Sequence, residues 1–551
     1  MPNPNLITKQ AAALTLSDAA KDLFRAVYQE QETNKGDTED DTVAKIKVDE
    51  IISKMSFFYE KIRNAVDYKD DHLLRKNAIE RILKRLNMMG HTEAEEIAKT
   101  LLVELIRAGY LKNNTIPETK INEVAAVIEN FAKLRQLALA TGKKENQEID
   151  EVRKWINNLT ATNLEELLGD HSVDQVIGRQ MFDIINVNIV DGGENKEFTR
   201  DKKVQIYIGI YTKLFKYDDA MLEYMLFRYF NPNWGEANDE AVALIAQHYF
   251  ELREAVAQNL RHPFRKQVGK IVNRYNIYFS ILKDAIAEYP SATYDKLKEH
   301  PDQFKKVVAK ICERRYHESR GRLTRGAIRS IVYIFLTKSI LVFILEIPAT
   351  IFLGEEIRNY SLIINVLFPP ALLFLIALMT AVPGDVNTAQ IQAGIEEIVF
   401  DEKKAKHPVK IGYPKKRKAA TNLIFGFFYT VTFLLSFSLV VWALTEIEFS
   451  FVSIIIFLFF LCMISFFGIR LGRFAKAYSV TEKRENIFSF AANFFYVPIV
   501  AMGKWLSESF SQINVFVFFL DFIIEAPFKI LVEMFEQWTA YVKERKEGIV
   551  E

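Results

Sequence analysis

Four apolar runs between Ile328 and Arg470 limit what this chain can fold into. They cover residues 328–353, 362–382, 423–444 and 451–469. A helix rises about 1.5 Å per residue, so roughly 20 apolar residues cross a hydrocarbon core of about 30 Å. The third and fourth runs contain no charged residue, and a buried helix of a water-soluble protein is rarely so long and so uniformly apolar. The sequence therefore predicts a bundle of four membrane-spanning helices.

The charges that flank the runs predict their orientation. Connections rich in Lys and Arg precede the first run, join the second to the third and follow the fourth. The two other connections are acidic, with Glu355 and Glu356 in one and Glu446 and Glu448 in the other. Because cytoplasmic loops carry the excess of Lys and Arg, we expect a multi-pass protein of the cell membrane with both termini in the cytoplasm.

The rest of the chain has the composition of an all-α protein. Only 22 Gly and 15 Pro occur in 551 residues, which favours long helices over sheets and loops. Apolar residues recur at helical spacing before the first run, and the helix expected over 294–318 continues into it. We predict cytoplasmic helical subdomains over 1–145 and 146–325, a transmembrane domain over 326–472, and amphipathic, membrane-associated helices over 473–551.

One region leaves the helical assignment open. Ile185, Val187 and Ile189 alternate with polar residues, and the residues from Val204 to Ile210 alternate again after a Gly-Gly pair. This pattern fits a β-hairpin near 184–210. It also fits two helices, since the aromatic residues that follow suit a helical face.

Two segments follow the fourth run. Residues 487–502 are apolar but short, and Gly503 interrupts them. Further on, polar residues form one narrow stripe at helical spacing on an otherwise apolar segment: Asn514, Asp521, Glu525, Lys529, Glu533 and Glu536. Such a segment lies in the cytoplasmic interface or re-enters the bundle, which is the favoured interpretation. Alternatively, 487–502 crosses the membrane and 513–532 returns; charge bias does not separate the two.

The first run carries two charges, Lys338 and Glu346. A charge at the bilayer centre costs about 2.5–3.5 kcal/mol on insertion scales and often marks a functional site. Eight residues of α-helix separate the two by about 12 Å and about 80°, so we expect no direct pair. The hypothesis is that they contact polar groups such as Asn365, or Asp521 and Lys529, and line an ion or proton path. The alternative is that each side chain extends toward its nearer membrane surface.

Six arginines precede or begin the first run: Arg314, Arg315, Arg320, Arg322, Arg325 and Arg329. They are candidates for binding anionic lipid headgroups, at about 1 kcal/mol each near a membrane surface. The alternative is that they only set the topology.

Motifs for catalysis or metal binding are missing from the sequence. The eight histidines are scattered, and there is no HExxH, Walker A, GxGxxG or GxSxG pattern. We therefore expect no metal and no cofactor, and the missing motifs favour a protein that is not an enzyme. A formal net charge of +1 gives no reason to expect nucleic-acid binding.

Two functions fit these observations. The favoured one is a partner-docking or assembly scaffold at the inner membrane face, in which the cytoplasmic helices bind another protein. The alternative is a channel or transporter whose path is lined by the first run and the C-terminal polar stripe. Since four helices enclose little space, the second function is expected to require a homo-oligomer.

Overall fold

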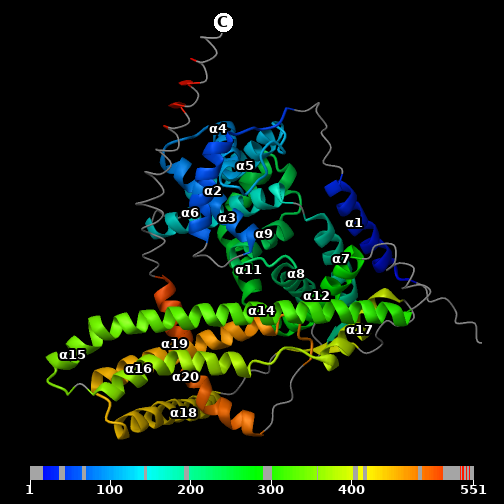
Figure 1. Ribbon diagram of the computed structural model, residues 1–551. Helices are drawn as coiled ribbons and strands as arrows, with labels where there is room; N and C mark the ends of the chain where they lie inside the picture. The colour runs from blue at the N-terminus through cyan, green and yellow to red at the C-terminus, as the bar shows by residue number, and fades with distance from the viewer. Residues whose placement is uncertain are drawn as a thin grey trace, which may run out of the picture. The chain divides into compact units, whose positions relative to one another are not determined.

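The computed structural model describes most of the chain. The described residues are 16–35, 44–64, 70–141, 146–169, 171–191, 198–288, 301–356, 358–400, 408–413, 419–481, 487–512 and a few single positions beyond Gln512. Most of them are helical (Figure 1), as the sequence predicts. The chain divides into two compact units, described separately below.

The first of these, here called the helical unit, comprises Asp18–Asn276, Ala405–Tyr413 and Phe516–Glu551. Its elements are α1 (Asp18–Lys35), α2 (Glu50–Asn64), α3 (Asp71–Met88), α4 (Ala94–Arg107), α5 (Lys120–Thr141), α6 (Asn146–Leu168), α7 (Ser172–Asn188), β1 (Ile189–Asp191), α8 (Phe198–Lys213), α9 (Asp219–Phe230), η1 (Trp234–Glu236), α10 (Asp239–Gln247), α11 (Tyr249–Leu260), the first half of α12 (Phe264–Glu288) and β2 (Val409–Ile411).

Amphipathic helices build the interior of the helical unit. The apolar face of α4 buries Leu101 and Leu105 against Ile82 of α3. A second cluster is aromatic: the rings of Trp155 and Phe227 lie edge to face with centroids 6.3 Å apart. Such pairs add to the burial energy of large rings.

The β-hairpin alternative near 184–210 is wrong. Helix α7 runs to Asn188 and α8 begins at Phe198, so the second alternating stretch is helical. Val204, Ile206, Ile208 and Ile210 are all buried, because α8 lies in the interior and is covered on several sides. The short strand β1 pairs instead with β2, in parallel.

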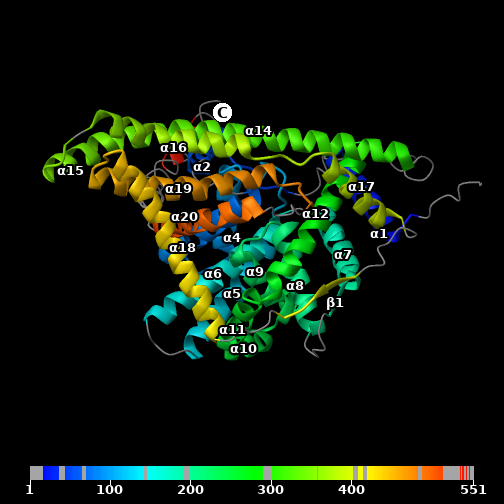
Figure 2. The ribbon, with the colours of Figure 1, turned by 90° about the horizontal axis from the view of Figure 1, so that it is seen from below.

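The second unit, here called the bundle unit, comprises Met1–Ser17, Ile277–Lys404 and Pro414–Val515. Its elements are the second half of α12, α14 (Pro301–Leu341), η2 (Val342–Glu346), α15 (Ile347–Phe352), α16 (Asn359–Met379), α17 (Asp385–Val399), α18 (Ala419–Glu446), α19 (Phe451–Ala475) and α20 (Ile487–Gln512). α16 and α19 lie alongside α14 in both ribbon views (Figures 1 and 2).

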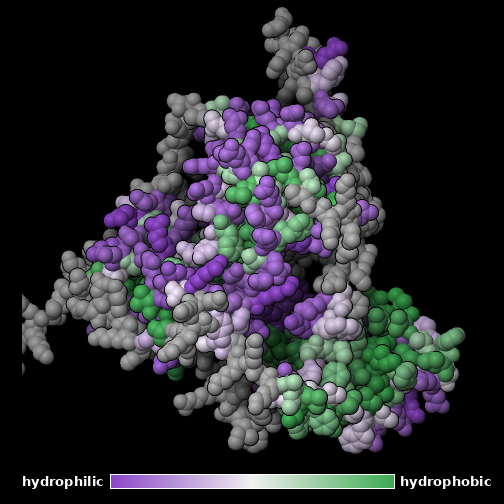
Figure 3. Space-filling view, turned by 180° about the vertical axis from the view of Figure 1, so that it is seen from behind, coloured by the Kyte–Doolittle hydropathy of each residue, from purple (hydrophilic) through white to green (hydrophobic). Residues whose placement is uncertain are grey.

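Four helices of the bundle unit are long and apolar enough to cross a membrane: Asp302–Phe352, Asn359–Met379, Ala419–Glu446 and Phe451–Ala475. They cover the four predicted runs, except that the second helix ends at Met379 and the first at Phe352, three residues and one residue before the predicted ends. The first is one continuous helical segment of 51 residues, as expected for a helix that enters the first run without a break. Figure 3 shows hydrophobic residues gathered over the bundle helices.

Small residues let the bundle helices approach closely. A methyl group on Gly468 of α19 would lie 2.8 Å from Ile376 of α16, and one on Gly326 of α14 would lie 3.0 Å from Leu471 of α19. Leu373 is buried between them. α14, α16 and α19 therefore form a packed three-helix core.

Helix α20 passes through Gly503 without interruption, contrary to the expectation of a break there. It packs along α19, where the hydroxyl of Tyr496 donates to the carbonyl of Ser465 at 3.0 Å. A methyl group on Gly503 would lie 2.0 Å from the carbonyl oxygen of Cys462. The glycine therefore marks the closest approach of the two helices. The predicted stripe at 513–532 lies outside the described residues.

Candidate functional site

Glu346 ends η2, a π-helical turn between α14 and α15. A π turn holds one residue more than an α turn. The π turn therefore absorbs one of the eight residues between Lys338 and Glu346. The rotation between the two side chains is then that of seven α-helical residues, about 20° short of two full turns. The two side chains therefore share a face of the helix, and both are fully buried. The expected offset of about 80° is wrong because it assumes a regular α-helix.

Two neighbouring helices donate hydrogen bonds to the Glu346 carboxylate. Nδ2 of Asn365 on α16 donates to Oε1 at 2.6 Å, and Oγ of Ser453 on α19 donates to the same oxygen at 2.6 Å. The structure thus brings together two of the residues singled out in the sequence, Glu346 and Asn365, and adds Ser453.

Several oxygens around this carboxylate are not engaged. Oε2 of Glu346, Oδ1 of Asn365 and Oγ of Ser361 have no hydrogen-bond partner within the described part of the chain, although all three are buried. Ser361 precedes Asn365 by one turn on the same face of α16. An unpaired buried polar group costs about 1–3 kcal/mol. The site therefore has spare acceptor capacity for water, a proton or an ion.

Each helix that flanks the carboxylate has a local irregularity, a π turn in one and a missing backbone hydrogen bond in the other. α14 changes to the π turn of η2, and α16 contains Pro369 and Pro370. Because Pro369 has no N–H, the carbonyl of Asn365 does not receive the usual helical hydrogen bond. Local breaks of this kind occur in membrane helices where the backbone is buried in protein or lines a polar path.

Lys338 lies one and a half to two turns nearer the basic end of the bundle, the end that carries the Arg-rich segment of α14. Its Nζ is 4.3 Å from the ring centroid of Phe460 on α19, a cation–π arrangement. No hydrogen bond to this Nζ is found among the residues described. The lysine and the glutamate both face the interior of one bundle.

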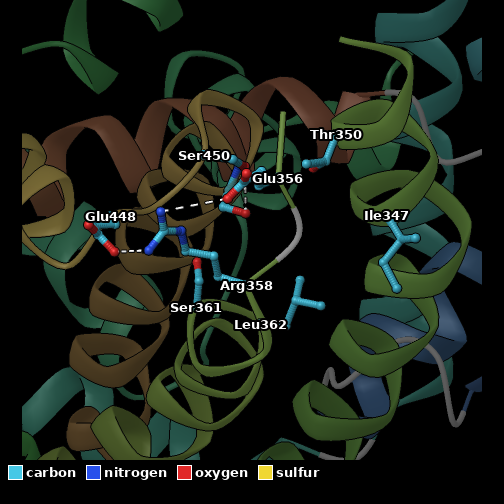
Figure 4. A pocket seen from close by; sticks show the side chains of 9 residues that line it. Ile347, Thr350, Glu356, Arg358, Ser361, Leu362, Glu448 and Ser450 are labelled. Carbon is cyan, nitrogen blue, oxygen red and sulfur yellow. Dashed lines mark hydrogen bonds and ion pairs between the residues drawn. The ribbon is translucent and has the colours of Figure 1, made fainter. Parts of the chain in front are cut away.

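A small pocket opens beside the site at the opposite, acidic end of the bundle (Figure 4). It has room for about one water molecule. Its lining residues are Ile347, Thr350, Glu356, Arg358, Ser361, Leu362, Glu448, Ser450 and Ser453. At its mouth Arg358 forms an ion pair with Glu448, and the hydroxyl of Tyr360 donates to Glu448 at 2.7 Å.

Two serines connect the pocket to the carboxylate. Ser450 caps the N-terminus of α19 by accepting from the backbone N–H of Ser453. The hydroxyl of Ser450 donates to Oγ of Ser453 at 2.9 Å, and Ser453 donates to Glu346. A hydrogen-bonded chain of two hydroxyls therefore runs from the pocket wall to Glu346.

The six arginines fall into two groups. Arg315 donates two hydrogen bonds to Asp284 at 2.7 Å each, and Arg314 pairs with Glu288. Both are committed to carboxylates of α12. The other four are exposed to solvent: Arg320, Arg322, Arg325 and Arg329.

The remaining sequence candidates, Asp521, Glu525 and Lys529, lie outside the described residues. Among the residues that the structure does describe, no group of His, Cys, Asp or Glu could hold a metal ion. Ser361, Ser450 and Ser453 are not among the residues predicted from the sequence. A usable signal is present, because Ser453 is a polar residue near the acidic start of the fourth run, the end toward which Glu346 also lies in the first run. No protein-family model matches the chain, and no curated protein or solved structure is significantly similar to it.

Proposed function

We propose that the protein is an integral membrane protein that moves a small ion across the bilayer through the polar site between α14, α16 and α19. The observation that carries this proposal is the Glu346 carboxylate, fully buried in a helix long enough to span, with one oxygen hydrogen-bonded and the other free for a ligand within the described structure. Ionisable groups inside a membrane are costly and usually mark ion or proton pathways.

The two irregular helices support the same function. Transporter sites are commonly built where membrane helices are interrupted, because the freed backbone groups can coordinate an ion. Here η2 and the Pro369–Pro370 pair flank the carboxylate from two sides. Since Lys338 and Glu346 face the interior of one bundle, the path lies within a single copy of the chain. A pore at the centre of an oligomer is not needed.

We also propose an orientation of the bundle in the membrane. The basic end of the bundle faces the cytoplasm and the acidic end, with the pocket, faces the other side, following the distribution of Lys and Arg. An ion from outside the cell then enters between Arg358 and Glu448 and reaches Glu346.

The test is charge movement by the full-length protein in liposomes adsorbed on a solid-supported membrane. A jump in ion concentration is expected to produce a transient current, which Glu346→Gln abolishes. The matched control is Glu446→Gln, which makes the same chemical change at an exposed carboxylate of the acidic end and should keep the current. Equal currents in Glu346→Gln and the unmodified protein would contradict the proposal.

A docking role for the helical unit is the second candidate. Met88 and Met89 at the end of α3 are 72% and 68% exposed, and flexible thioether side chains suit a partner-binding surface. A double Met88→Gln, Met89→Gln variant is expected to lose a protein that copurifies stoichiometrically with the unmodified chain. Val187→Gln, at another exposed apolar residue, serves as the control and should retain it.

A further inference from the structure

Resting on the proposed function, we infer that the translocated ion is a proton, and that it reaches Glu346 from the acidic end through the hydroxyls of Ser450 and Ser453. The hydrogen bonds are 2.9 Å from Ser450 to Ser453 and 2.6 Å from Ser453 to Glu346. Ser450 and Ser453 both line the pocket, so that water in the pocket can reach the two hydroxyls.

A hydroxyl chain transmits protons because each hydroxyl both donates and accepts. A serine oxygen has one O–H and two lone pairs. Ser450 uses one lone pair for the backbone N–H of Ser453, so its second lone pair is available to a water in the pocket. Such a chain passes a proton without movement of any oxygen atom, whereas a metal ion would have to displace the hydroxyls.

Size and charge also favour the proton. The pocket has room for about one water, whereas hard cations such as Mg²⁺ and Ca²⁺ require six to eight oxygen ligands. Among the described residues of the bundle unit, the buried acidic and basic side chains are Glu346 and Lys338. The charge of Lys338 repels a unit positive charge at Glu346 by about 1 kcal/mol across roughly 12 Å at an effective dielectric constant near 20, and a divalent metal ion about twice as strongly. A proton neutralises the carboxylate without adding a second ion.

Proton transfer along the relay takes three steps. A hydronium ion in the pocket gives a proton to Oγ of Ser450 and becomes water. Ser450 passes its own hydroxyl proton to Ser453, and Ser453 passes its proton to Oε1 of Glu346. One O–H bond of hydronium is broken and one O–H bond of a neutral carboxyl is formed. Glu356, Arg358 and Glu448 are the charged groups at the pocket mouth, and Lys338 is the charged group on the other side.

The experiment measures proton influx into liposomes that contain the full-length protein and an enclosed pH-sensitive dye. A potassium gradient with valinomycin sets the membrane potential, and sodium is replaced by a large organic cation. Proton influx is expected to fall to the level of Glu346→Gln in Ser453→Ala and to be retained in Ser453→Thr, which keeps a hydroxyl. Ser450→Asn preserves the helix cap but removes the hydroxyl, and is also expected to lose influx.

The control is Ser339→Ala, because the Ser339 hydroxyl donates to the carbonyl of Phe335 in its own helix. Its influx should equal that of the unmodified protein. A carboxyl C=O infrared band that appears on acidification, and is missing in Glu346→Gln, provides a second readout independent of transport.

The outcomes separate the two proposals. Sodium or potassium flux that depends on Glu346, without proton influx, overturns the proton assignment and leaves ion translocation standing. Proton influx that is unchanged in both Ser453→Ala and Ser450→Asn overturns the serine relay. Absence of any Glu346-dependent flux overturns the proposed function together with this inference.

Discussion

Glu165 on α6 is a carboxylate buried within the helical unit, where Arg75 of α3 donates to its two oxygens at 2.6 and 2.7 Å. Burial raises the pKa of Glu165 from 4.5 to about 7, although Arg75 acts in the opposite direction. Removing a carboxylate from water disfavours its charged form, and this effect is the larger one here. The residue therefore links α3 to α6 through Arg75.

The stability of the helical unit is therefore expected to fall as pH rises from 4.5 to about 7. In this pH window the unfolded chain releases the Glu165 proton while the folded chain retains it. The stabilisation that Glu165 contributes is therefore fully present below pH 4.5 and is lost above about 7. Its size is at most about 3 kcal/mol. Melting of the protein in detergent should show this slope, and Glu165→Gln should reduce it. Glu129→Gln, at an exposed carboxylate, is the control; the same slope in all three proteins would refute the assignment.

The arginines at the basic end are expected to act differently according to their partners. Replacing Arg320, Arg322 and Arg325 by Gln should remove the thermal stabilisation that anionic lipid gives, at about 1 kcal/mol per residue. Arg315→Gln should instead lower the melting temperature in neutral and anionic lipid alike, because Asp284 loses its two-pronged partner. Identical behaviour of the two variants across lipid mixtures would argue against a headgroup site.

Among the elements, the π turn η2 determines which way Glu346 faces. Deleting Ile344, which is exposed, should convert the turn to α-helix while keeping Lys338 and Glu346 about 20° from two full turns. Inserting one Ala at the same place should rotate Glu346 away by about 100°. We expect the deletion variant to have a melting temperature near that of the unmodified protein. The insertion variant is expected to be strongly destabilised, because the insertion moves the Glu346 carboxylate away from its hydrogen-bond donors. The reverse order would show that η2 does not set the register.

The α19–α20 contact depends on a residue without a side chain. Gly503→Ala is expected to push the helices apart and to make α20 more susceptible to protease, because its methyl group cannot fit against the carbonyl of Cys462. Gly426→Ala on α18 is the matched control, since nothing lies within 4 Å of the added carbon and Ala favours helix. Equal protection of α20 in both variants would be inconsistent with the packing described.

The elements that could be predicted from sequence are those set by local composition. Four long apolar runs suffice to locate the candidate spans, and Asn365 is among the expected partners of Glu346. The π turn could not be predicted, because its sequence, Val-Phe-Ile-Leu-Glu, is ordinary for an α-helix. The role of Gly503 was misread for a similar reason: a glycine that breaks a helix and one that admits a neighbour look alike until the neighbour is known.

The whole chain offers a direct test of orientation. Both cysteines, Cys312 and Cys462, are buried, so a variant with both replaced by Ser provides a background for single reporters. Glu446→Cys should react with a membrane-impermeant thiol reagent added to intact cells, and Arg325→Cys should react only after the cells are opened. Labelling of both, or of neither, before opening would contradict the proposed topology.

The first candidate span belongs to a helical segment of 51 residues, about 76 Å long at 1.5 Å per residue. A continuous helix resists compression along its axis. A displacement or tilt of the helix near Pro301 would therefore shift Glu346 along the bundle axis relative to Ser453. The π turn η2 lies within this segment and ends at the carboxylate. A force on the part of this helix outside the membrane would therefore change the hydrogen bond between Ser453 and Glu346.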